Sequence, residues 1–224
     1  MLPRKLIDTA KVPGSGGELR LMQRGSEFSI MLGQNELMSS RLSGSEEALA
    51  VLTCARLRKD AAPHLLIGGY GMGFTLRAAL AVVAPVAHLT VAELVPEIIS
   101  WARGPMAVLA AGCLDDPRVD LVERDVAAVI GAARDAYDAI LLDVDNGPDG
   151  LVRAANDRLY SAAGLASAKA ALKLHGILAV WSAGPDAAFG RRLNDAGFLV
   201  EEVVVRARAN GKGPRHVIWF AKRE

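Results

Sequence analysis

The sequence contains few of the features that mark secreted, membrane-spanning or nucleic-acid-binding proteins. Its two cysteines, Cys54 and Cys113, are far apart and lack the short spacing of a metal site or a disulfide framework. No apolar run approaches the roughly 18 residues of a membrane span, and the first dozen residues lack the apolar core of a signal peptide. The formal net charge is only +1, so no basic excess favours nucleic acid. We therefore expect a cytoplasmic protein that binds neither membrane nor nucleic acid, with both cysteines reduced and buried.

Histidine, a common metal ligand, is also scarce. The chain has four, at His64, His88, His175 and His216. The first three each stand at the start of a predicted strand, which favours a structural role over membership of a metal-binding cluster. We therefore expect no bound metal.

Glycine is concentrated in one informative stretch. Residues 64–67 are a short apolar run, typical of a buried strand in a parallel sheet. A glycine-dense turn follows at 68–73, and residues 74–84 predict an alanine- and leucine-rich helix that Pro85 ends. A strand, a glycine turn and a helix in this order are typical of the first unit of a nucleotide-binding α/β fold. The glycines let the backbone approach a ligand closely, and the helix N-terminus offers free N–H groups.

The spacing of these glycines narrows the choice of nucleotide. Gly69, Gly71 and Gly73 follow a G-x-G-x-G pattern. A dinucleotide fingerprint would place its third glycine at position 74, which is Phe74, and the Gly-Lys-Ser/Thr of a P-loop is absent. The pattern resembles motif I of the class I S-adenosylmethionine-dependent methyltransferase fold, so we expect the three glycines to bind the cofactor. A glycine-rich turn that binds no ligand is the alternative.

The rest of the chain alternates strands with helices. Further strands are predicted at 88–93, 119–123, 139–142, 177–181, 199–206 and 216–221, and further helices at 96–101, 126–133, 159–174 and 186–196. No helix separates the last two strands, so they should pair as an antiparallel hairpin. We therefore expect an α/β protein with a doubly wound, mostly parallel seven-stranded sheet, a methyltransferase-like Rossmann fold.

Residues 1–44 have a different pattern. Residues 18–23 and 27–32 alternate polar with apolar side chains and are followed by tight turns, which predicts a small antiparallel β-meander. The meander is too small to be stable alone, so it should pack on the main domain or on a second subunit. Ser45 is a candidate cap for a helix with Glu46 and Glu47 in its first turn. We therefore expect two parts, a meander at 1–44 and an S-adenosylmethionine-binding Rossmann-like domain at 45–224.

Two acids at predicted strand ends are candidates for holding the nucleoside. Glu93 ends the second strand, where a carboxylate can accept hydrogen bonds from both ribose hydroxyls, and Leu94 beside it belongs to the same expected site. Asp125 follows the third strand and could accept a bond from an adenine amino group while the N–H of Val126 donates to a ring nitrogen. The alternatives are a solvated acid at position 93 and a helix cap at position 125.

A further pair of acids stands where the reaction would occur. Asp143 ends the fourth strand, where we expect it also to bind the cofactor beside its sulfonium, and Asp145 lies two residues later. Two nearby carboxylates can attract a cationic amine and accept its proton, which matters because an amine must be neutral to attack. A simple turn is the alternative, since Asp-Asn-Gly-Pro is also good turn chemistry. Trp181, at the end of a later strand, either lines the pocket or fills the core.

From about Leu19 to Ala221 the chain resembles the spermidine synthase (polyamine aminopropyltransferase) family. The resemblance is carried by the meander ending at 36–40, by 45–47, by the glycine turn, and by 91–97, 116–119, 124–125, 137–143 and 159–160. It implies a transferase with S-adenosylmethionine or its decarboxylated form as co-substrate, a small-molecule amine or other small acceptor, and a homodimer. In that family the acids matching Glu93 and Asp125 hold ribose and adenine. The acid matching Asp143 lies by the attacking amine, and the tyrosine matching Tyr160 lies near the amine substrate.

Departures from the family pattern leave the transferred group open. The family turn reads Gly-Gly-Gly-Asp-Gly-Gly, and its aspartate binds the ammonium of decarboxylated S-adenosylmethionine; here Gly71, or Tyr70 in a shifted register, is uncharged. The family's Asp-x-x-Asp-Pro is replaced by Asp-Val-Asp-Asn-Gly-Pro at 143–148. Without the aspartate, the helix that begins at Phe74 could accept the carboxylate of intact S-adenosylmethionine.

Three hypotheses follow from these patterns. We favour an aminopropyltransferase, on the family resemblance. A methyltransferase acting on a small molecule is the first alternative, and a non-catalytic nucleoside-binding homologue is the second.

Overall fold

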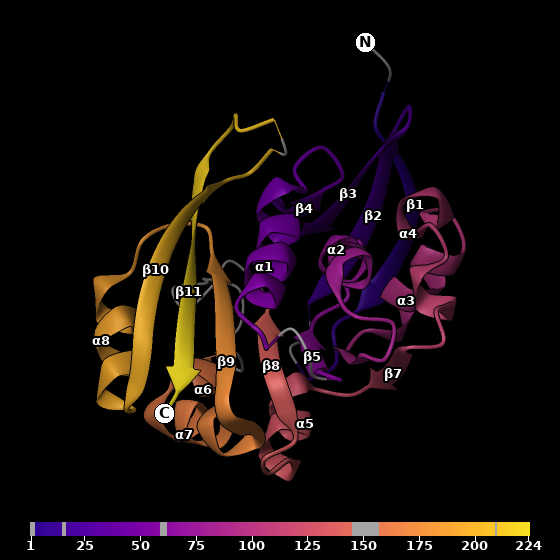
Figure 1. Ribbon diagram of the computed structural model, residues 1–224. Helices are drawn as coiled ribbons and strands as arrows, with labels where there is room; N and C mark the ends of the chain where they lie inside the picture. Colours follow the sequence, from indigo (N-terminus) through magenta and orange to yellow (C-terminus); the bar gives the residue numbers. More distant parts are fainter. Residues whose placement is uncertain (1–2, 15–16, 59–61, 145–156, 209) are drawn as a thin grey trace.

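The strands form two sheets in the computed structural model, which describes residues 3–14, 17–58, 62–144, 157–208 and 210–224 (Figure 1). The N-terminal sheet is antiparallel, in the order β1 (Lys5–Lys11), β2 (Glu18–Arg24), β3 (Glu27–Leu32) and β4 (Asn35–Ser39). The larger sheet has seven strands in the order β10-β11-β9-β8-β5-β6-β7. These are β5 (His64–Gly68), β6 (His88–Glu93), β7 (Val119–Glu123), β8 (Tyr137–Leu142), β9 (Leu172–Ser182), β10 (Phe198–Arg206) and β11 (Arg215–Arg223).

The large sheet has the doubly wound arrangement that the sequence predicts. Strand β5 pairs in parallel with β6 on one side and with β8 on the other, so the chain reverses its direction of winding there. Strand β11 lies antiparallel between β9 and β10, which confirms the predicted C-terminal hairpin. In such sheets ligands bind at the carboxyl ends of the strands, at the point of reversal.

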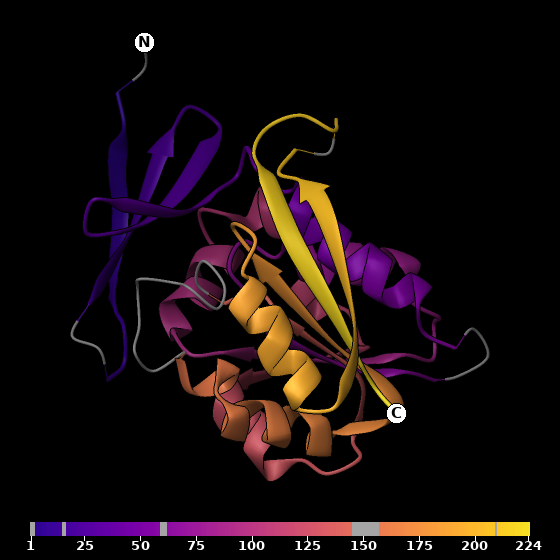
Figure 2. The same cartoon turned by 90° about the vertical axis from the view of Figure 1, so that its left-hand side faces the viewer.

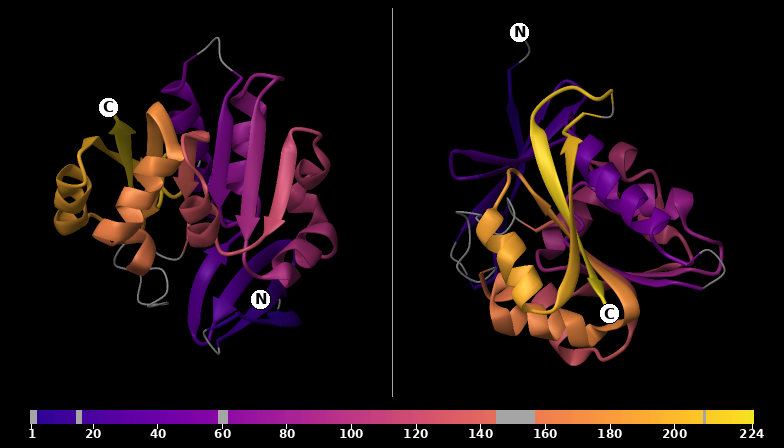
Figure 3. Two further views of the ribbon diagram at one scale, coloured as in Figure 1. Left: turned by 90° about the horizontal axis from the view of Figure 1, so that it is seen from below. Right: turned by 60° about the vertical axis from the view of Figure 1, so that its left-hand side comes forward.

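Helices cover both faces of the large sheet (Figures 2 and 3). They are α1 (Gly44–Ala55), α2 (Phe74–Val82), α3 (Pro96–Arg103), α4 (Ala107–Ala110), α5 (Val126–Ala132), α6 (Asp157–Tyr160), α7 (Ala162–Ala171) and α8 (Ala187–Asp195), with a 3-10 turn at Cys113–Asp115. Successive strand residues point to opposite faces. Leu65 and Ile67 therefore join a core with α1 and α2, and Leu66 joins a second core with α5, α7 and α8. No helix among the described residues is long and apolar enough to cross a membrane.

The N-terminal sheet is attached to the main body by its apolar face. Leu21, Phe28 and Ile30 are buried in the same core as Trp101 of α3. The Trp101 indole N–H also donates to the Asp8 carboxylate, with a distance of 2.8 Å between Nε1 and Oδ2. Burial of large apolar side chains, rather than backbone pairing, therefore fixes this sheet on the main body.

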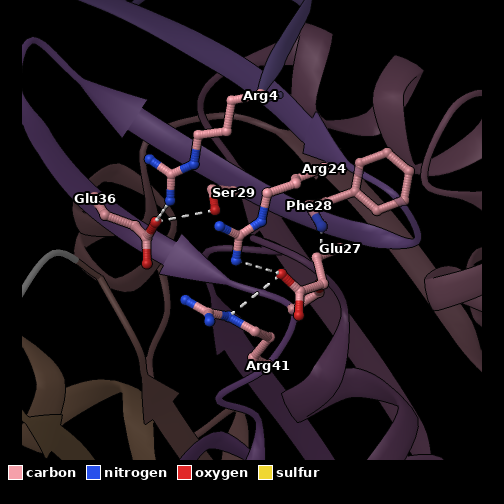
Figure 4. Close-up of polar contacts among 8 residues, drawn as sticks. Arg4, Arg24, Glu27, Phe28, Ser29, Glu36 and Arg41 are labelled. Carbon is pink, nitrogen blue, oxygen red and sulfur yellow. Dashed lines mark hydrogen bonds and ion pairs between the residues drawn. The ribbon is translucent and has the colours of Figure 1, made fainter. Parts of the chain in front are cut away.

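The polar side chains of the N-terminal sheet form ion pairs (Figure 4). Glu36 accepts hydrogen bonds from Arg4 at 2.5 Å and from Ser29 at 3.0 Å. Glu27 lies 3.1 Å from the Arg24 guanidinium and 3.7 Å from that of Arg41. Such partly exposed pairs contribute little to stability, so they keep the surface polar and leave the packing of the apolar face to hold the sheet.

Strand β1 and the region around residue 160 differ from the sequence prediction. Strand β1 was not predicted, because its mostly exposed residues lack the alternation that marks a half-buried strand. The helix predicted at 159–174 is wrong as a single element. Ser161 interrupts it by capping α7, where its Oγ accepts a hydrogen bond from the N–H of Gly164 at 3.1 Å. Residues 172–174 already belong to β9, in which Leu172 pairs with Tyr137.

The start of α1 also differs from the prediction. Ser43, not Ser45, stands at the N-cap, and its side chain makes no capping hydrogen bond. Ser45 lies within the first turn and is completely buried. Its hydroxyl therefore points into the protein, where its partners are side chains of other residues.

The packing of α1 predicts that alanine substitutions at two positions in this helix differ in their effect on the free energy of unfolding. Leu49 is fully buried, whereas Val51 is 41% exposed. Replacing Leu49 with Ala should lower the free energy of unfolding by about 2–5 kcal/mol, because it leaves a cavity beneath the sheet. Val51→Ala should change it by less than about 0.5 kcal/mol. Urea unfolding followed by circular dichroism measures both, and equal losses would show that α1 does not pack as described.

Candidate functional site

A pocket lies at the carboxyl ends of the central parallel strands, between them and the N-terminal sheet. Its main-body lining comes from the turn after β5, the end of β6 and the segments after β7 and β8. The N-terminal sheet and its connections contribute the apolar side chains Val12, Leu19, Leu32, Leu37 and Met38. The pocket therefore has one wall that can form hydrogen bonds and one that excludes water.

The glycine turn has the backbone conformation that only glycine adopts easily. Gly69, Gly71 and Gly73 have φ angles of +80°, +56° and +80°, in a region that costs other residues roughly 1–2 kcal/mol. Gly69 and Gly71 line the pocket, whereas Gly73 is not among its lining residues. The Tyr70 hydroxyl is 2.5 Å from the place that a Cβ at Gly73 would occupy. Gly73 thus makes room for Tyr70 and shapes the turn.

The first turn of α2 is buried beneath this glycine turn. Phe74, Thr75 and Leu76 are at most 7% exposed, and none of them lines the pocket. The expectation that this helix N-terminus receives a carboxylate therefore has no support in the described residues.

Met38 covers Gly71, the position at which the family pattern has an aspartate and this chain has an uncharged residue. A Cβ added at Gly71 would lie 2.6 Å from Met38 Cε and 2.7 Å from Sδ. A larger residue at position 71 would have to displace the Met38 thioether. The pocket is therefore apolar at this point.

Glu93 is held rigidly at the end of β6. Its Oε2 accepts the N–H of Tyr70 at 2.9 Å, and its Oε1 accepts the N–H of Val95 at 2.8 Å. Burial raises the pKa of Glu93, and these backbone N–H groups oppose that rise. The backbone N–H groups of Leu94 and Gly71 also donate to this carboxylate and lower its pKa, so ribose hydroxyls would share its oxygens with the backbone. Glu93 and the adjacent Leu94 both line the pocket, and their ligand contacts stay a prediction.

Asp125 caps a helix, which is one of the two functions that the sequence left open. Its Oδ1 caps α5 by accepting the N–H of Ala127 at 2.8 Å. The side chain is exposed and, with Val126, lines the pocket. Among the described residues, no hydrogen-bond donor contacts Oδ2. Capping therefore leaves one oxygen for a ligand, and the adenine contact stays a prediction.

Asp143 lines the pocket next to a second carboxyl group that the sequence analysis did not identify. Thr75 Oγ1 donates to Asp143 Oδ2 at 3.2 Å, and burial raises the pKa of Asp143 to about 6. Glu46 of α1 lies close by, and burial, followed by the charge of Asp143, raises its pKa to about 8. Two coupled carboxyls titrate as a pair. The sequence marked Glu46 and Glu47 equally, as favourable charges in a first helical turn, and contained no signal that only Glu46 contributes to this pair.

The other predicted residues lie away from the pocket lining or outside the described residues. Asp145 falls in the segment 145–156, outside the described residues. Tyr160 is 3% exposed and packs edge-on against Phe189, with 5.5 Å between ring centroids. Trp181 is 8% exposed and packs against His216 at 4.8 Å. Neither aromatic residue lines the pocket. The described part of the chain contains no group of three or more His, Cys, Asp or Glu residues placed to bind a metal ion.

Comparison with known proteins relates this site to one family. The model of the spermine/spermidine synthase domain matches residues 51–185. The polyamine aminopropyltransferase 1 of Streptomyces coelicolor is 39% identical over 103 residues, which are 44% of this chain and 18% of that protein. The polyamine aminopropyltransferase 2 of Pseudomonas aeruginosa is 34% identical over 98 residues, or 42% of this chain and 28% of that protein. The matched segment thus spans less than a third of either relative.

Solved structures show the same fold over nearly the whole chain. The spermidine synthase of Thermotoga maritima superimposes with a TM-score of 0.76 and 17% identity, covering 98% of this chain and 73% of that one. A spermidine synthase in complex with the transition-state analogue AdoDATO gives the same TM-score at 18% identity and the same coverage. At these identities the likeness concerns the fold.

The raised pKa of Asp143 predicts a pH-dependent difference in stability. Its folded value of about 6 lies above the ordinary 3.8, so the folded protein holds the proton more tightly and loses stability as the pH rises through this range. Asp143→Asn removes that loss, and the variant should gain stability relative to the natural protein between about pH 4 and pH 7. Urea unfolding at several pH values measures the difference.

Glu46 titrates as a pair with Asp143, so removing the Asp143 charge also lowers the pKa of Glu46, which adds to the stability difference in the same direction. Burial lowers the pKa values of His64 and His216, which works in the opposite direction but is common to both proteins. Asp125→Asn is the matched control, because asparagine also caps a helix, and it should keep the natural pH dependence. A stability difference for Asp143→Asn that does not vary with pH would contradict the burial of this carboxyl.

Proposed function

Because the chain belongs to the spermine/spermidine synthase family, we propose that it is a transferase that moves an aminopropyl group to a small acceptor amine. The donor in this proposal is decarboxylated S-adenosylmethionine. The observation that supports it is the charge of the pocket. Among the described residues that line it, Glu93, Asp125 and Asp143 are the only charged ones, and all three are acidic.

An acidic pocket discriminates between the two forms of the donor. Decarboxylated S-adenosylmethionine carries a sulfonium and an ammonium, both of which acids attract. The intact form adds a carboxylate, which would meet acids and no cationic side chain among the described lining residues. Two charges about 4 Å apart interact by roughly 1–4 kcal/mol at dielectrics between water and the protein surface. This difference supports a preference for the decarboxylated donor.

The nucleoside half of the donor would lie along the main-body wall of the pocket. In this proposal Glu93 accepts bonds from the ribose hydroxyls, and Asp125 with the N–H of Val126 binds the adenine edge. Gly69 and Gly71 let the backbone approach the ligand. The apolar side chains of the N-terminal sheet exclude water, which strengthens each of these polar contacts.

Asp143 would prepare the acceptor amine for attack. The ammonium form gives a proton to the Asp143 carboxylate, which frees the nitrogen lone pair. The nitrogen then attacks the carbon bonded to the sulfonium, the C–S bond breaks, and its electron pair leaves with sulfur as a neutral thioether. The pKa of about 6 makes Asp143 a better proton acceptor than an ordinary aspartate.

Several other assignments of the family resemblance stay predictions within this proposal. They are a role for Asp145 and Tyr160 at the acceptor amine, a homodimer, and a cytoplasmic location. Methyl transfer is the second candidate function. It is favoured by one observation, that Met38 covers Gly71 where the family carries an ammonium-binding aspartate.

Calorimetric titration with the two donor forms separates these functions. We expect the decarboxylated form to bind at least about tenfold more tightly, a difference of about 1.4 kcal/mol, because the pocket repels the carboxylate of the intact form. Tighter binding of intact S-adenosylmethionine would overturn aminopropyl transfer in favour of methyl transfer. Binding of neither would show that the assignment of Glu93 and Asp125 to the nucleoside is wrong.

The role of Asp143 predicts a separation of binding from turnover. Asp143→Asn should lower kcat by about 10²–10⁴-fold, the usual contribution of a general base, while the donor still binds with an affinity weakened only about tenfold, because one of the three pocket acids is lost. Assays with 1,4-diaminobutane as the trial acceptor measure turnover, and calorimetry measures binding. The non-catalytic alternative requires instead that the natural protein binds the donor and turns over no amine.

A further inference from the structure

A line of hydrogen-bonded side chains connects the C-terminal hairpin with the pocket. Ser45, completely buried at the start of α1, has its Oγ 2.7 Å from Glu46 Oε2 and 2.9 Å from His216 Nδ1. His216 belongs to β11 and is held by the Trp181 ring at 4.8 Å. Thr75 Oγ1 lies within 3.5 Å of both the Glu46 carbonyl oxygen and Asp143 Oδ2, which places Asp143 against the start of α1, where its charge raises the pKa of Glu46. Side chains from β11, β9 and α1 are thus in contact with one another in a line that ends at the Asp143 carboxyl.

The backbone holds both ends of this line in place. The N–H of Gly44 donates to the carbonyl of Ala207 at 2.9 Å, and Ala207 directly follows β10 in the loop of the hairpin. Thr75 Oγ1 lies 3.2 Å from Asp143 Oδ2 and 3.5 Å from the Glu46 carbonyl oxygen. The start of α1 is therefore fixed to β10 and β11 on one side and to α2 and β8 on the other.

Electrostatic repulsion favours the retention of one proton by this pair of carboxyls. The charged groups that face Glu46 are Asp143, which follows β8, and Glu47 of α1 itself, and both are acids. No cation pairs with Glu46 or Asp143 in the described part of the chain. Two neighbouring carboxylates removed from water repel each other, so one of them retains a proton where an isolated acid would lose it.

We propose that Glu46 is a positioning residue that shares a proton with Asp143, and that Ser45 and His216 hold it in place for this purpose. Asp143 alone of the pair lines the pocket, so Glu46 acts through it. The proposal rests on the function proposed above. When both carboxyls are ionised and the acceptor ammonium gives its proton to Asp143, the proton can move on to Glu46. Asp143 is then again a carboxylate, and no atom other than that proton has moved.

Ser45 has one hydroxyl hydrogen, which it can donate either to Glu46 or to His216. The protonation state of Glu46 therefore determines which ring nitrogen of His216 carries the hydrogen. When Glu46 is ionised, Ser45 donates to it and accepts the Nδ1–H of His216. When Glu46 is protonated, its O–H donates to Ser45, and Ser45 donates to an unprotonated Nδ1. Burial lowers the pKa of His216, so the ring stays neutral and changes tautomer instead of charge.

NMR of isotope-labelled imidazole nitrogens and side-chain carboxyl carbons tests this in the natural protein without any substrate. We expect the His216 tautomer to switch between about pH 6 and 8, together with the Glu46 carboxyl signal. Ser45→Ala should abolish the switch at His216 while Glu46 still titrates. A Glu46 carboxyl that titrates near its ordinary value of 4.5, with no tautomer change, would overturn the proposal.

The pH profile of turnover provides the second test. Glu46→Gln should lower kcat by about tenfold or more, remove the upper step of the kcat profile, and change KM for 1,4-diaminobutane by less than about twofold. Glu47→Gln, the same change one residue away, should leave the profile as it is. Superimposable profiles for the two variants would overturn the proposal. Absence of turnover in a protein whose His216 switch is intact would count against the proposed transferase function and not against the shared proton.

Discussion

The register of three parallel strands determines where the chemistry of this protein can occur. Gly68 at the end of β5 pairs with Ala92 of β6 and with Leu142 of β8. The next residue along each strand is Gly69, Glu93 or Asp143, so the glycine turn emerges between two carboxyl groups. The backbones are so close that a Cβ at Gly69 would lie 3.2 Å from the Asp143 carbonyl oxygen. A shift of one residue in either pairing would turn every side chain of that strand to the other face and separate the acids.

This dependence on strand register explains which parts of the site were predictable. Strand-end acids and glycine spacing are local in the sequence, and parallel pairing brings them together whatever the rest of the fold does. The contact between Ser45 and His216 spans 171 positions and depends on how α1 crosses the C-terminal hairpin. No periodicity or motif encodes such a crossing, so Glu46 could be read only as a charge at the start of a helix. The interruption at Ser161 was missed for a related reason, since alanine-rich segments on both sides favour one continuous helix.

The apolar side chains of the N-terminal sheet change the electrostatic environment of the acids in the main body. Side chains such as Leu37 and Met38 line one wall of the pocket that Asp143 also lines. Removing water from this space raises the free energy of each unpaired carboxylate. It also strengthens the attraction between these carboxylates and a positively charged ligand group. The charged pairs of the same sheet, Arg4 with Glu36 and Arg24 with Glu27, stand apart from the pocket lining. The N-terminal sheet can therefore be polar where it meets solvent and still make the site dry.

The attachment of α1 to the final strands has a consequence for how the protein is made. Arg56 at the end of α1 forms a bidentate pair with Glu201 of β10 and lies over the Phe220 ring of β11 at 3.9 Å. The strands that carry these partners, and His216 with them, leave the ribosome after β5, β6 and β8. A nascent chain that has already formed β5, β6 and β8 holds Gly69, Glu93 and Asp143 in register while α1 still lacks its support. The nucleoside half of the pocket can thus form before β10 and β11 are made, whereas the surroundings of Glu46 are complete only after these two strands have been added.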